Sequence, residues 1–309
     1  MAEIRRVLIT GGCGFIGANL VRWLGDRKGW SLRVVDDLRT GTSDNLAGRA
    51  EIVVGDVADA ALLERALEGV DAVIHLASQT GVAPSVEDPV RDFEGNTRAT
   101  FFTLEGCRRH GIEHFVYASS GAALGDVEPP LHEELVARPL YPYGAGKLAG
   151  EGYCRGYAGS FGMHTVALRF ANVYGPFSAH KNNAVPNFIA GCLRGEAIEI
   201  FGDGGQTRDF VYVEDLCAGI VAALESEGTS GEVFQLGTGV ETSILELVEV
   251  IQEATGFRGE VRRHPGRPGE VRRSRVDISK ARRLLGFDPR VGLAEGISRT
   301  AAWYRERPA

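Results

Sequence analysis

A tyrosine and a lysine stand four residues apart in the segment Tyr143-Gly144-Ala145-Gly146-Lys147. Pro142 precedes them, and because proline suits the first turn of a helix, the sequence predicts a helix that begins here. Residues four apart share one helix face. An ammonium group beside a phenol favours the phenolate, which would lower the tyrosine pKa from its ordinary value of about 10. The pair is therefore a candidate acid/base centre that takes a proton from a hydroxyl group near neutral pH.

A glycine-rich turn near the N-terminus predicts a second component of the chemistry. A buried strand is predicted over residues 6–10 and an amphipathic helix over residues 18–24. Gly12, Gly14 and Gly17 lie between them with the G-x-G-x-x-G spacing. Such glycines let the backbone approach a pyrophosphate at the helix N-terminus. We therefore expect a dinucleotide cofactor at Gly11, Gly14, Phe15, Ile16 and Gly17.

An acidic pair at the end of the next predicted strand indicates which dinucleotide binds. This strand covers residues 31–35 and ends in Asp36-Asp37, with Asp36 19 residues after Gly17. A carboxylate there accepts hydrogen bonds from the ribose hydroxyls of NAD and repels the additional phosphate of NADP. The predicted cofactor is NAD, contacted by Asp36 and Asp37.

Strands and helices then continue to alternate. Further strands are expected at residues 52–54, 72–76 and 114–118, with helices at 62–67 and 93–109. Strict alternation predicts a parallel sheet with helices on both faces, and ligands bind beyond the carboxyl ends of its strands. The expected fold is α/β, a Rossmann-type doubly wound parallel sheet with a smaller C-terminal α/β substrate lobe. Asp56 and Val57 would flank the adenine, and Leu76, Ala77 and Ser78 the middle of the cofactor.

Composition limits the kinds of partner. The 309 residues carry a net charge of −7 and contain no long basic run, which argues against a nucleic-acid partner. No apolar run approaches the roughly 18 residues that span a bilayer, so no membrane association is expected. The five cysteines are scattered without a CxxC pair, which favours reduced thiols in the cytoplasm and no metal site.

The sequence resembles the extended short-chain dehydrogenase/reductase family, and within it the nucleotide-sugar 4-epimerases of the UDP-galactose 4-epimerase type. The resemblance covers essentially the whole chain. It rests on the loop at residues 10–17, Asp36, residues 75–77, Asn96, Ser119-Ser120, Tyr143 with Lys147, and the later blocks at residues 169–176, 208–211 and 267–270.

The resemblance implies a catalytic set of Ser120, Tyr143 and Lys147. Tyr143 would be the acid/base, Lys147 would lower its pKa and hold the nicotinamide ribose, and Ser120 would bind the reacting sugar oxygen. Asn96 and Ser119 would support the cofactor, which Tyr143 and Lys147 also contact. The implied reaction inverts C4 of a UDP-hexose, either glucose or galactose, through a transient 4-keto sugar.

The second half of the chain resembles a lobe that binds the UDP-sugar. Phe201 would pack on the uracil, Arg208 and Arg267 would clamp the diphosphate, and Glu270 would accept the uridine ribose hydroxyls. The implied substrate contacts are Thr80, Ser120, Asn172, Asn183, Phe201, Arg208, Arg267 and Glu270. We expect an NAD-binding domain of residues 1–170 with about 204–237, and a nucleotide-sugar lobe of 171–203 and 238–309. The family's usual homodimer would use the helices at 93–109 and 147–160.

Three positions depart from the epimerase pattern. Leu124 replaces a usual tyrosine, Thr80 stands where UDP-galactose epimerases often carry a lysine, and Ser274 stands where a large tyrosine can narrow the sugar pocket. A small residue at that gate leaves room for a 2-acetamido group, so we expect the UDP-N-acetylhexosamines to be accepted as well.

Other reactions remain open on this fold. The 4,6-dehydratases and decarboxylases of the family carry carboxylates just after the catalytic serine or threonine, whereas this chain has Gly121 and Ala122. A UDP-glucuronate 4-epimerase is an alternative because His180 or Lys181 could meet a sugar carboxylate. A non-catalytic NAD-binding sensor is another, although it would not need Ser120, Tyr143 and Lys147 together.

Replacing Tyr143 with phenylalanine tests the acid/base assignment. The Tyr143→Phe variant should retain NAD, visible in the absorbance of the purified protein, and should lose turnover because the proton acceptor is gone. Retained turnover would remove Tyr143 from this role.

Overall fold

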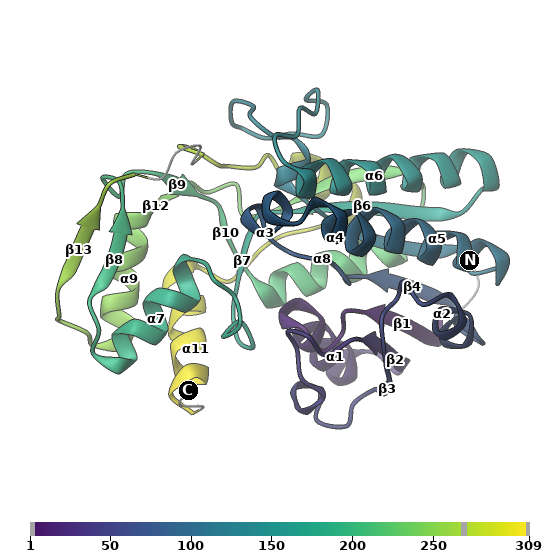
Figure 1. Ribbon diagram of the computed structural model, residues 1–309, viewed down its shortest axis with the longest axis horizontal. Helices are drawn as coiled ribbons and strands as arrows, with labels where there is room; N and C mark the ends of the chain where they lie inside the picture. Colours follow the sequence, from purple (N-terminus) through teal and green to yellow (C-terminus); the bar gives the residue numbers. More distant parts are fainter. Residues whose placement is uncertain (1–3, 267–270, 307–309) are drawn as a thin grey trace.

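The computed structural model describes residues 4–266 and 271–306, and its centre is a seven-stranded parallel sheet (Figure 1). The strand order is β11-β6-β5-β4-β1-β2-β3, which confirms the predicted α/β fold. The strands are β1 (Arg6–Thr10), β2 (Ser31–Asp36), β3 (Glu51–Val54), β4 (Ala72–His75), β5 (His114–Ser120), β6 (His164–Phe170) and β11 (Glu232–Leu236). Parallel pairing brings all their carboxyl ends to one edge, where ligands of such sheets bind.

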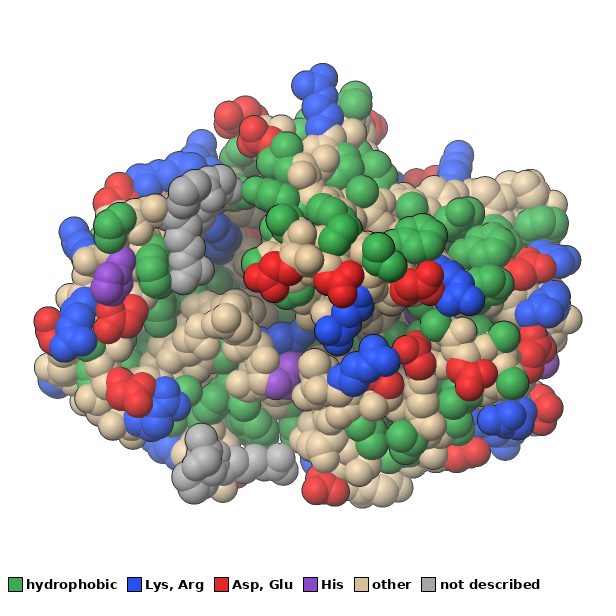
Figure 2. Space-filling model, viewed as in Figure 1, with side chains coloured by type: hydrophobic (Ala, Val, Ile, Leu, Met, Phe, Trp, Pro, Cys, Tyr) green, Lys and Arg blue, Asp and Glu red, His purple; other side chains and the backbone are tan. Residues whose placement is uncertain are grey.

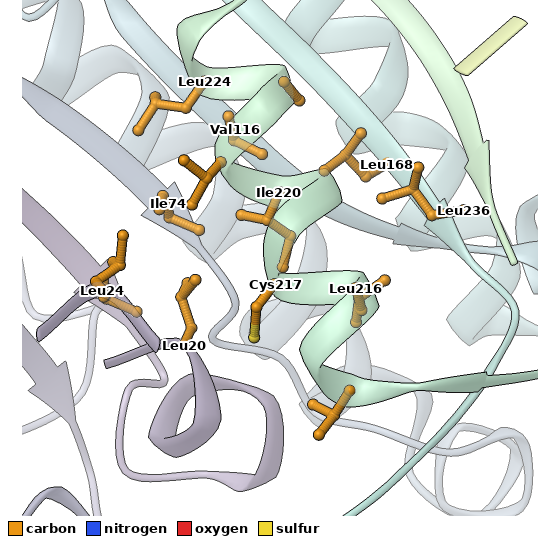
Figure 3. Close-up of a cluster of buried hydrophobic side chains, with 14 of the residues drawn as sticks. Leu20, Leu24, Ile74, Val116, Leu168, Leu216, Cys217, Ile220, Leu224 and Leu236 are labelled. Carbon is orange, nitrogen blue, oxygen red and sulfur yellow. The ribbon is translucent and has the colours of Figure 1, made fainter. Parts of the chain in front are cut away.

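Helices cover both faces of this sheet. One face packs against α1 (Phe15–Arg27) and α8 (Val213–Glu225), and the other against α2 (Ala60–Leu67), α5 (Ala99–Arg109) and α6 (Pro142–Phe161). Figure 3 shows the first of these layers, in which Leu20 of α1 and Ile220 of α8 lie over Ile74 and Val116 of the sheet. These side chains are fully or almost fully buried. Packing on both faces holds the strands in place, and with them the residues at their carboxyl ends.

A smaller lobe follows β6 and has its own core. It contains three two-stranded pairs, β10-β7, β12-β9 and β13-β8, packed with three helices. The strands are β7 (Asn172–Tyr174), β8 (Ile198–Phe201), β9 (Thr207–Arg208), β10 (Phe210–Tyr212), β12 (Thr242–Ser243) and β13 (Val261–His264), and the helices are α7 (Ala184–Arg194), α9 (Ile244–Thr255) and α11 (Leu293–Arg305). Helix α10 (Ser279–Leu285) returns to the edge strand β11.

Short elements fill the connections. They are η1 (Ser43–Leu46), α3 (Val82–Glu87), α4 (Pro89–Asp92), η2 (Phe93–Arg98) and η3 (Gly121–Ala123). The helix predicted over residues 93–109 is confirmed as an unbroken helical stretch, in which η2 is π-helical and α5 is α-helical. Within the described part of the chain, no helix is long and apolar enough to cross a membrane.

Truncating a side chain in the layer between α8 and the sheet should destabilise the protein. Ile220 is 0% exposed, so Ile220→Ala should lower the free energy of unfolding by about 2–5 kcal/mol. Val240→Ala, at a position that is 60% exposed, is the control and should change it by less than about 0.5 kcal/mol. Denaturant unfolding measures both, and equal effects would contradict this packing.

Candidate active site

The glycine-rich loop after β1 has a geometry that only glycine permits. Gly11 has a φ of +70°, and a Cβ added there would lie 2.7 Å from the backbone nitrogen of Ala77. A Cβ on Gly17 would lie 2.4 Å from the carbonyl oxygen of Gly11. Helix α1 begins directly after the loop, and its N-cap Gly14 has no side chain to accept the first N–H groups. These N–H groups are available to an anion such as a pyrophosphate.

Asp36 stands at the carboxyl end of β2 beside this loop. Its carboxylate accepts hydrogen bonds from the backbone N–H groups of Cys13 and Leu38, each at 2.9 Å, and burial raises its pKa. From the neighbouring connection, the Asn45 amide donates to the Cys13 carbonyl at 3.2 Å, a contact that sequence reasoning missed. The loop and Asp36 thus fit the pyrophosphate and ribose of a dinucleotide.

Asp37 and Asp56, two of the predicted cofactor contacts, lie closer to the protein surface than Asp36. Arg39 forms ion pairs with Asp37 and Asp56, both at 3.2 Å. The side chains of Arg39 and Asp56 are 54% and 41% exposed. Val57, next to Asp56, is buried in the apolar layer that contains α2. The structure therefore leaves the predicted adenine end as an open, charged rim.

Asn96 joins the loop after β4 to the turn η2. Its carbonyl oxygen accepts a hydrogen bond from the Ser78 hydroxyl at 2.6 Å, and its amide donates to the Gln79 carbonyl at 2.9 Å and to Asp92 at 2.8 Å. The side chain is 1% exposed. A Cβ on Gly146 of α6 would lie 3.1 Å from Thr97, so η2 packs closely on the helix that carries the Tyr–Lys pair. Asn96 thereby connects the loop at Ser78 and Gln79 to the turn that packs on that helix.

Lys147 and Tyr143 lie on one face of α6, as predicted. The Lys147 side chain is buried, and its ammonium group donates to the Ala118 carbonyl of β5 at 2.8 Å. The same nitrogen lies 5.7 Å from the centre of the Tyr143 ring. Ser120, the last residue of β5, lies close enough to Tyr143 for its hydroxyl to lower the pKa of the tyrosine. Three predicted catalytic residues therefore meet at the carboxyl end of β5.

The direction of the Tyr143 pKa differs from the prediction. Burial raises the pKa of Tyr143 to about 12, while the hydrogen bond from Ser120 works in the lowering direction. Burial also lowers the pKa of Lys147 to about 7. The predicted low pKa of Tyr143 is wrong for the protein by itself, because the cost of burying a phenolate is the largest influence on this residue.

A buried ion pair anchors α6 to the sheet. Arg169 of β6 donates two hydrogen bonds to Glu151 of α6, at 2.8 and 2.7 Å, and both side chains are 4% exposed. The Ser119 hydroxyl donates to the same carboxylate at 2.5 Å. Because this bond uses the one hydrogen of the hydroxyl, the Ser119 side chain could contact a cofactor only as an acceptor. The pair was not foreseen, although a glutamate and an arginine inside apolar elements were the available signal.

Four predicted substrate residues line one pocket of about 290 Å³ in the smaller lobe, namely Asn172, Asn183, Phe201 and Arg208. The ring of Phe201 stacks on His264 with centroids 5.2 Å apart. The space-filling view shows a recess between the smaller lobe and the sheet-bearing part of the molecule (Figure 2). Arg267 and Glu270 fall outside the described residues.

The three residues that depart from the epimerase pattern lie in three different environments. Leu124 is 0% exposed in the core and does not reach the site. Ser274 is half-buried. Thr80 is not part of the pocket lining and instead contacts Lys181 at 3.2 Å.

Comparison with known proteins shows which family the chain belongs to. Residues 7–237 match the NAD dependent epimerase/dehydratase family. The chain belongs to this family. It is 40% identical to the UDP-glucose 4-epimerase of Mycolicibacterium smegmatis over 98% of this chain and 99% of that protein. It is also 34% identical to a dTDP-glucose 4,6-dehydratase of Streptomyces niveus over 98% of this chain and 94% of that protein.

Solved structures of family members agree with the fold. A UDP-glucose 4-epimerase from Thermotoga maritima, solved with UDP-glucose, has a TM-score of 0.92 and 36% identity, covering 97% of this chain and 99% of that one. A UDP-glucose 4-epimerase from Thermus thermophilus, solved with NAD, has a TM-score of 0.91 and 37% identity, covering 98% and 99%. The protein is thus an NAD-dependent nucleotide-sugar epimerase/dehydratase.

Removing the Ser120 hydroxyl should move the pH dependence of this enzyme upward. Because that hydroxyl lowers the pKa of Tyr143, Ser120→Ala should raise the pKa, so that the phenolate forms only at higher pH. In a plot of kcat against pH, the region where kcat rises should move to higher pH. The value of kcat at neutral pH should fall about 10-fold for every pH unit of this movement. Ser160→Ala, at an exposed serine near the end of α6, should leave this region in place. An unmoved region in Ser120→Ala would contradict the contact.

Proposed function

We propose that this enzyme is a UDP-hexose 4-epimerase that inverts C4 of UDP-glucose or UDP-galactose, and of the UDP-N-acetylhexosamines, through a transient 4-keto sugar. The observation that carries the proposal is the meeting of Tyr143, Ser120 and Lys147 at the carboxyl end of β5, beside the NAD-type glycine loop. The similarity to UDP-glucose 4-epimerases over the full chain supports it.

In the proposed reaction, Tyr143 and Ser120 act on one sugar oxygen. Ser120 hydrogen bonds to the 4-hydroxyl, and Tyr143 removes its proton as C4 is oxidised. NAD, held by the glycine loop and Asp36, would supply the hydride acceptor for C4 and a positive charge that favours the phenolate. The 4-keto sugar then rotates so that its other face meets the hydride donor, and Tyr143 returns the proton to O4. Lys147, held by the Ala118 carbonyl, would bind the nicotinamide ribose.

The pocket in the smaller lobe would hold the nucleotide end of the substrate. Phe201 would pack on the base, and Asn172 and Asn183 would hydrogen bond to the diphosphate or sugar. Arg208 would bind the diphosphate, for which its planar guanidinium is well shaped. Its Nη1 already donates to the Thr207 and Val271 carbonyls, at 2.7 and 2.8 Å, which orients the group in the pocket.

The residues after β5 favour epimerisation over dehydration. A 4,6-dehydratase needs an acid and a base to remove the C5 proton and the C6 hydroxyl, and relatives with that activity carry carboxylates after the catalytic serine or threonine. Here β5 is followed by η3, which consists of Gly121, Ala122 and Ala123. Since these residues cannot donate or accept a proton with a side chain, the 4-keto sugar would be reduced again.

The domain division and the homodimer are also proposals. Strand β11 pairs with β6, so part of the 204–237 segment extends the main sheet. On the outer side of η2 and α6, Phe93, Tyr153 and Phe161 are 52%, 37% and 53% exposed. Such apolar side chains suit a face that a second copy would cover. A cytoplasmic location stays a prediction.

A panel of UDP-sugars tests the function directly. Incubation of the enzyme with UDP-glucose, UDP-galactose and the two UDP-N-acetylhexosamines should yield the 4-epimer of each, followed by NMR, without net formation of NADH. Formation of a 4-keto-6-deoxy sugar would show a dehydratase instead. Turnover of UDP-glucose without the acetamido sugars would contradict the role assigned to Ser274.

A further inference from the structure

The buried ammonium group of Lys147 lies over a second tyrosine ring in addition to that of Tyr143. Its nitrogen is 5.1 Å from the centre of the Tyr117 ring and 5.7 Å from the centre of the Tyr143 ring. A cation within about 6 Å of a ring centre is attracted by the negative face of the aromatic π system. Tyr117 has no part in the reaction proposed above, so its contact with the lysine is a separate feature of the site.

The Tyr117 ring is held between neighbouring elements. Tyr117 is 0% exposed and stands opposite His75 in the register of β5 on β4. The rings of these two residues are stacked, with centroids 6.1 Å apart and an angle of 19° between their planes. On the side of α6, a Cβ on Gly150 would lie 2.4 Å from the Tyr117 ring, so glycine lets the helix rest on the ring. Packing against β4 and α6 therefore restrains the orientation of the ring.

The ammonium group has little other direct compensation for its burial. Within residues 4–266 and 271–306, its one hydrogen bond goes to the Ala118 carbonyl, and no carboxylate lies within ion-pair distance of it. Burial raises the pKa of Tyr117, so this phenol keeps its proton and offers no negatively charged oxygen. The attraction between Tyr117 and Lys147 therefore comes from the face of the ring.

Besides the two tyrosines, ionisable groups on four elements act on the Lys147 charge. Asp92 of α4 and Glu151 of α6 favour the charged form, and Lys181 of the loop between β7 and α7 disfavours it. His75 of β4 is neutral, because burial lowers its pKa to about 3. These groups are the same in a protein that differs only at position 117, so a substitution there isolates the effect of the ring.

We propose that Tyr117 is a positioning residue whose ring face holds the Lys147 ammonium group beside Tyr143 and favours its charged form. This inference rests on the proposed function, in which Lys147 binds the nicotinamide ribose next to the proton acceptor. It makes the aromatic character of position 117 a requirement of the site. Phenylalanine would meet this requirement, whereas an aliphatic side chain would fill the space without attracting the cation.

The charge of Lys147 can be measured directly, because the chain has only four lysines, namely Lys28, Lys147, Lys181 and Lys280. In the NAD-bound enzyme with carbon-13-labelled lysine, the NMR shift of the lysine ε-carbon follows protonation as the pH changes, and Lys147→Arg identifies the signal. In Tyr117→Leu the midpoint of this titration should fall by about one pH unit, since loss of the ring disfavours the ammonium form. In Tyr117→Phe the midpoint should stay in place.

Phe115→Leu is the matched control. Phe115 is also 0% exposed, precedes Tyr117 by two residues on β5 and stacks on His75 with centroids 5.9 Å apart. In the described structure, the cation–π contacts of Lys147 are with Tyr117 and Tyr143. Both leucine variants remove an aromatic ring from one apolar layer and should lose stability, but only Tyr117→Leu should move the lysine titration.

A further variant tests the ring without shortening the side chain. Pentafluorophenylalanine at position 117 has nearly the shape of phenylalanine, but its fluorine atoms draw electrons away from the ring face. The midpoint should therefore fall below that of Tyr117→Phe. This variant decides the matter if Tyr117→Leu does not fold.

The kinetic consequence follows the same titration. At a pH above the midpoint, Tyr117→Leu should epimerise UDP-glucose with a kcat about 10-fold lower for every pH unit that the midpoint falls. Its KM should stay unchanged, because Tyr117 does not line the pocket proposed for the nucleotide.

Several results would overturn the inference. An unmoved or raised midpoint in Tyr117→Leu, or an equal fall in Phe115→Leu, would show that the ring does not act on the lysine charge. A fall in Tyr117→Phe would assign the effect to the hydroxyl instead. If the unaltered enzyme epimerised no UDP-sugar, the proposed function would be refuted, while the NMR titration would still decide whether Tyr117 acts on Lys147.

Discussion

The burial of the Lys147 ammonium group against the end of β5 is the constraint on which the rest of the site depends. A charge that is 3% exposed needs a partner, and the Ala118 carbonyl at 2.8 Å supplies it only if α6 lies directly on the sheet. That approach requires glycine on the helix, since a Cβ on Gly150 would lie 2.4 Å from the Tyr117 ring. The Glu151–Arg169 pair, one helical turn further on, holds the same contact from the other strand. Tyr143 is positioned as a consequence.

The same burial acts against the charged forms of both Tyr143 and Lys147. Removal from water disfavours both charged forms, which raises the Tyr143 pKa to about 12 and lowers the Lys147 pKa to about 7. In the proposed mechanism the positive charge of NAD must supply what the lysine alone does not. Proton removal from the sugar is thereby tied to occupancy of the cofactor site, so a substrate hydroxyl is not deprotonated without a hydride acceptor.

Local patterns in the sequence predicted much of this molecule. The glycine spacing, the acidic residue after β2, the alternation of strands and helices and the Tyr143–Lys147 spacing are short-range signals, and the strand order and helix faces agree with them. Contacts between distant residues were not predictable in this way. The Lys181–Thr80 hydrogen bond and the Glu151–Arg169 pair depend on how separate elements pack. The π-helical geometry of η2, where Asn96 donates to Asp92, was likewise not visible in the helical pattern of residues 93–109. The predicted direction of the Tyr143 pKa shift was wrong because a spacing of four residues carries no information on burial.

The central claim is that Tyr143 removes a proton from O4 while the hydrogen on C4 leaves and returns to the same carbon. UDP-glucose carrying deuterium at C4 tests it most directly. The account predicts slower turnover of the labelled sugar and UDP-galactose that retains the deuterium at C4, detected by NMR. Loss of the deuterium to solvent, or its appearance at C6, would contradict the account, because hydrogen would then leave C4 as a proton or be delivered to another carbon.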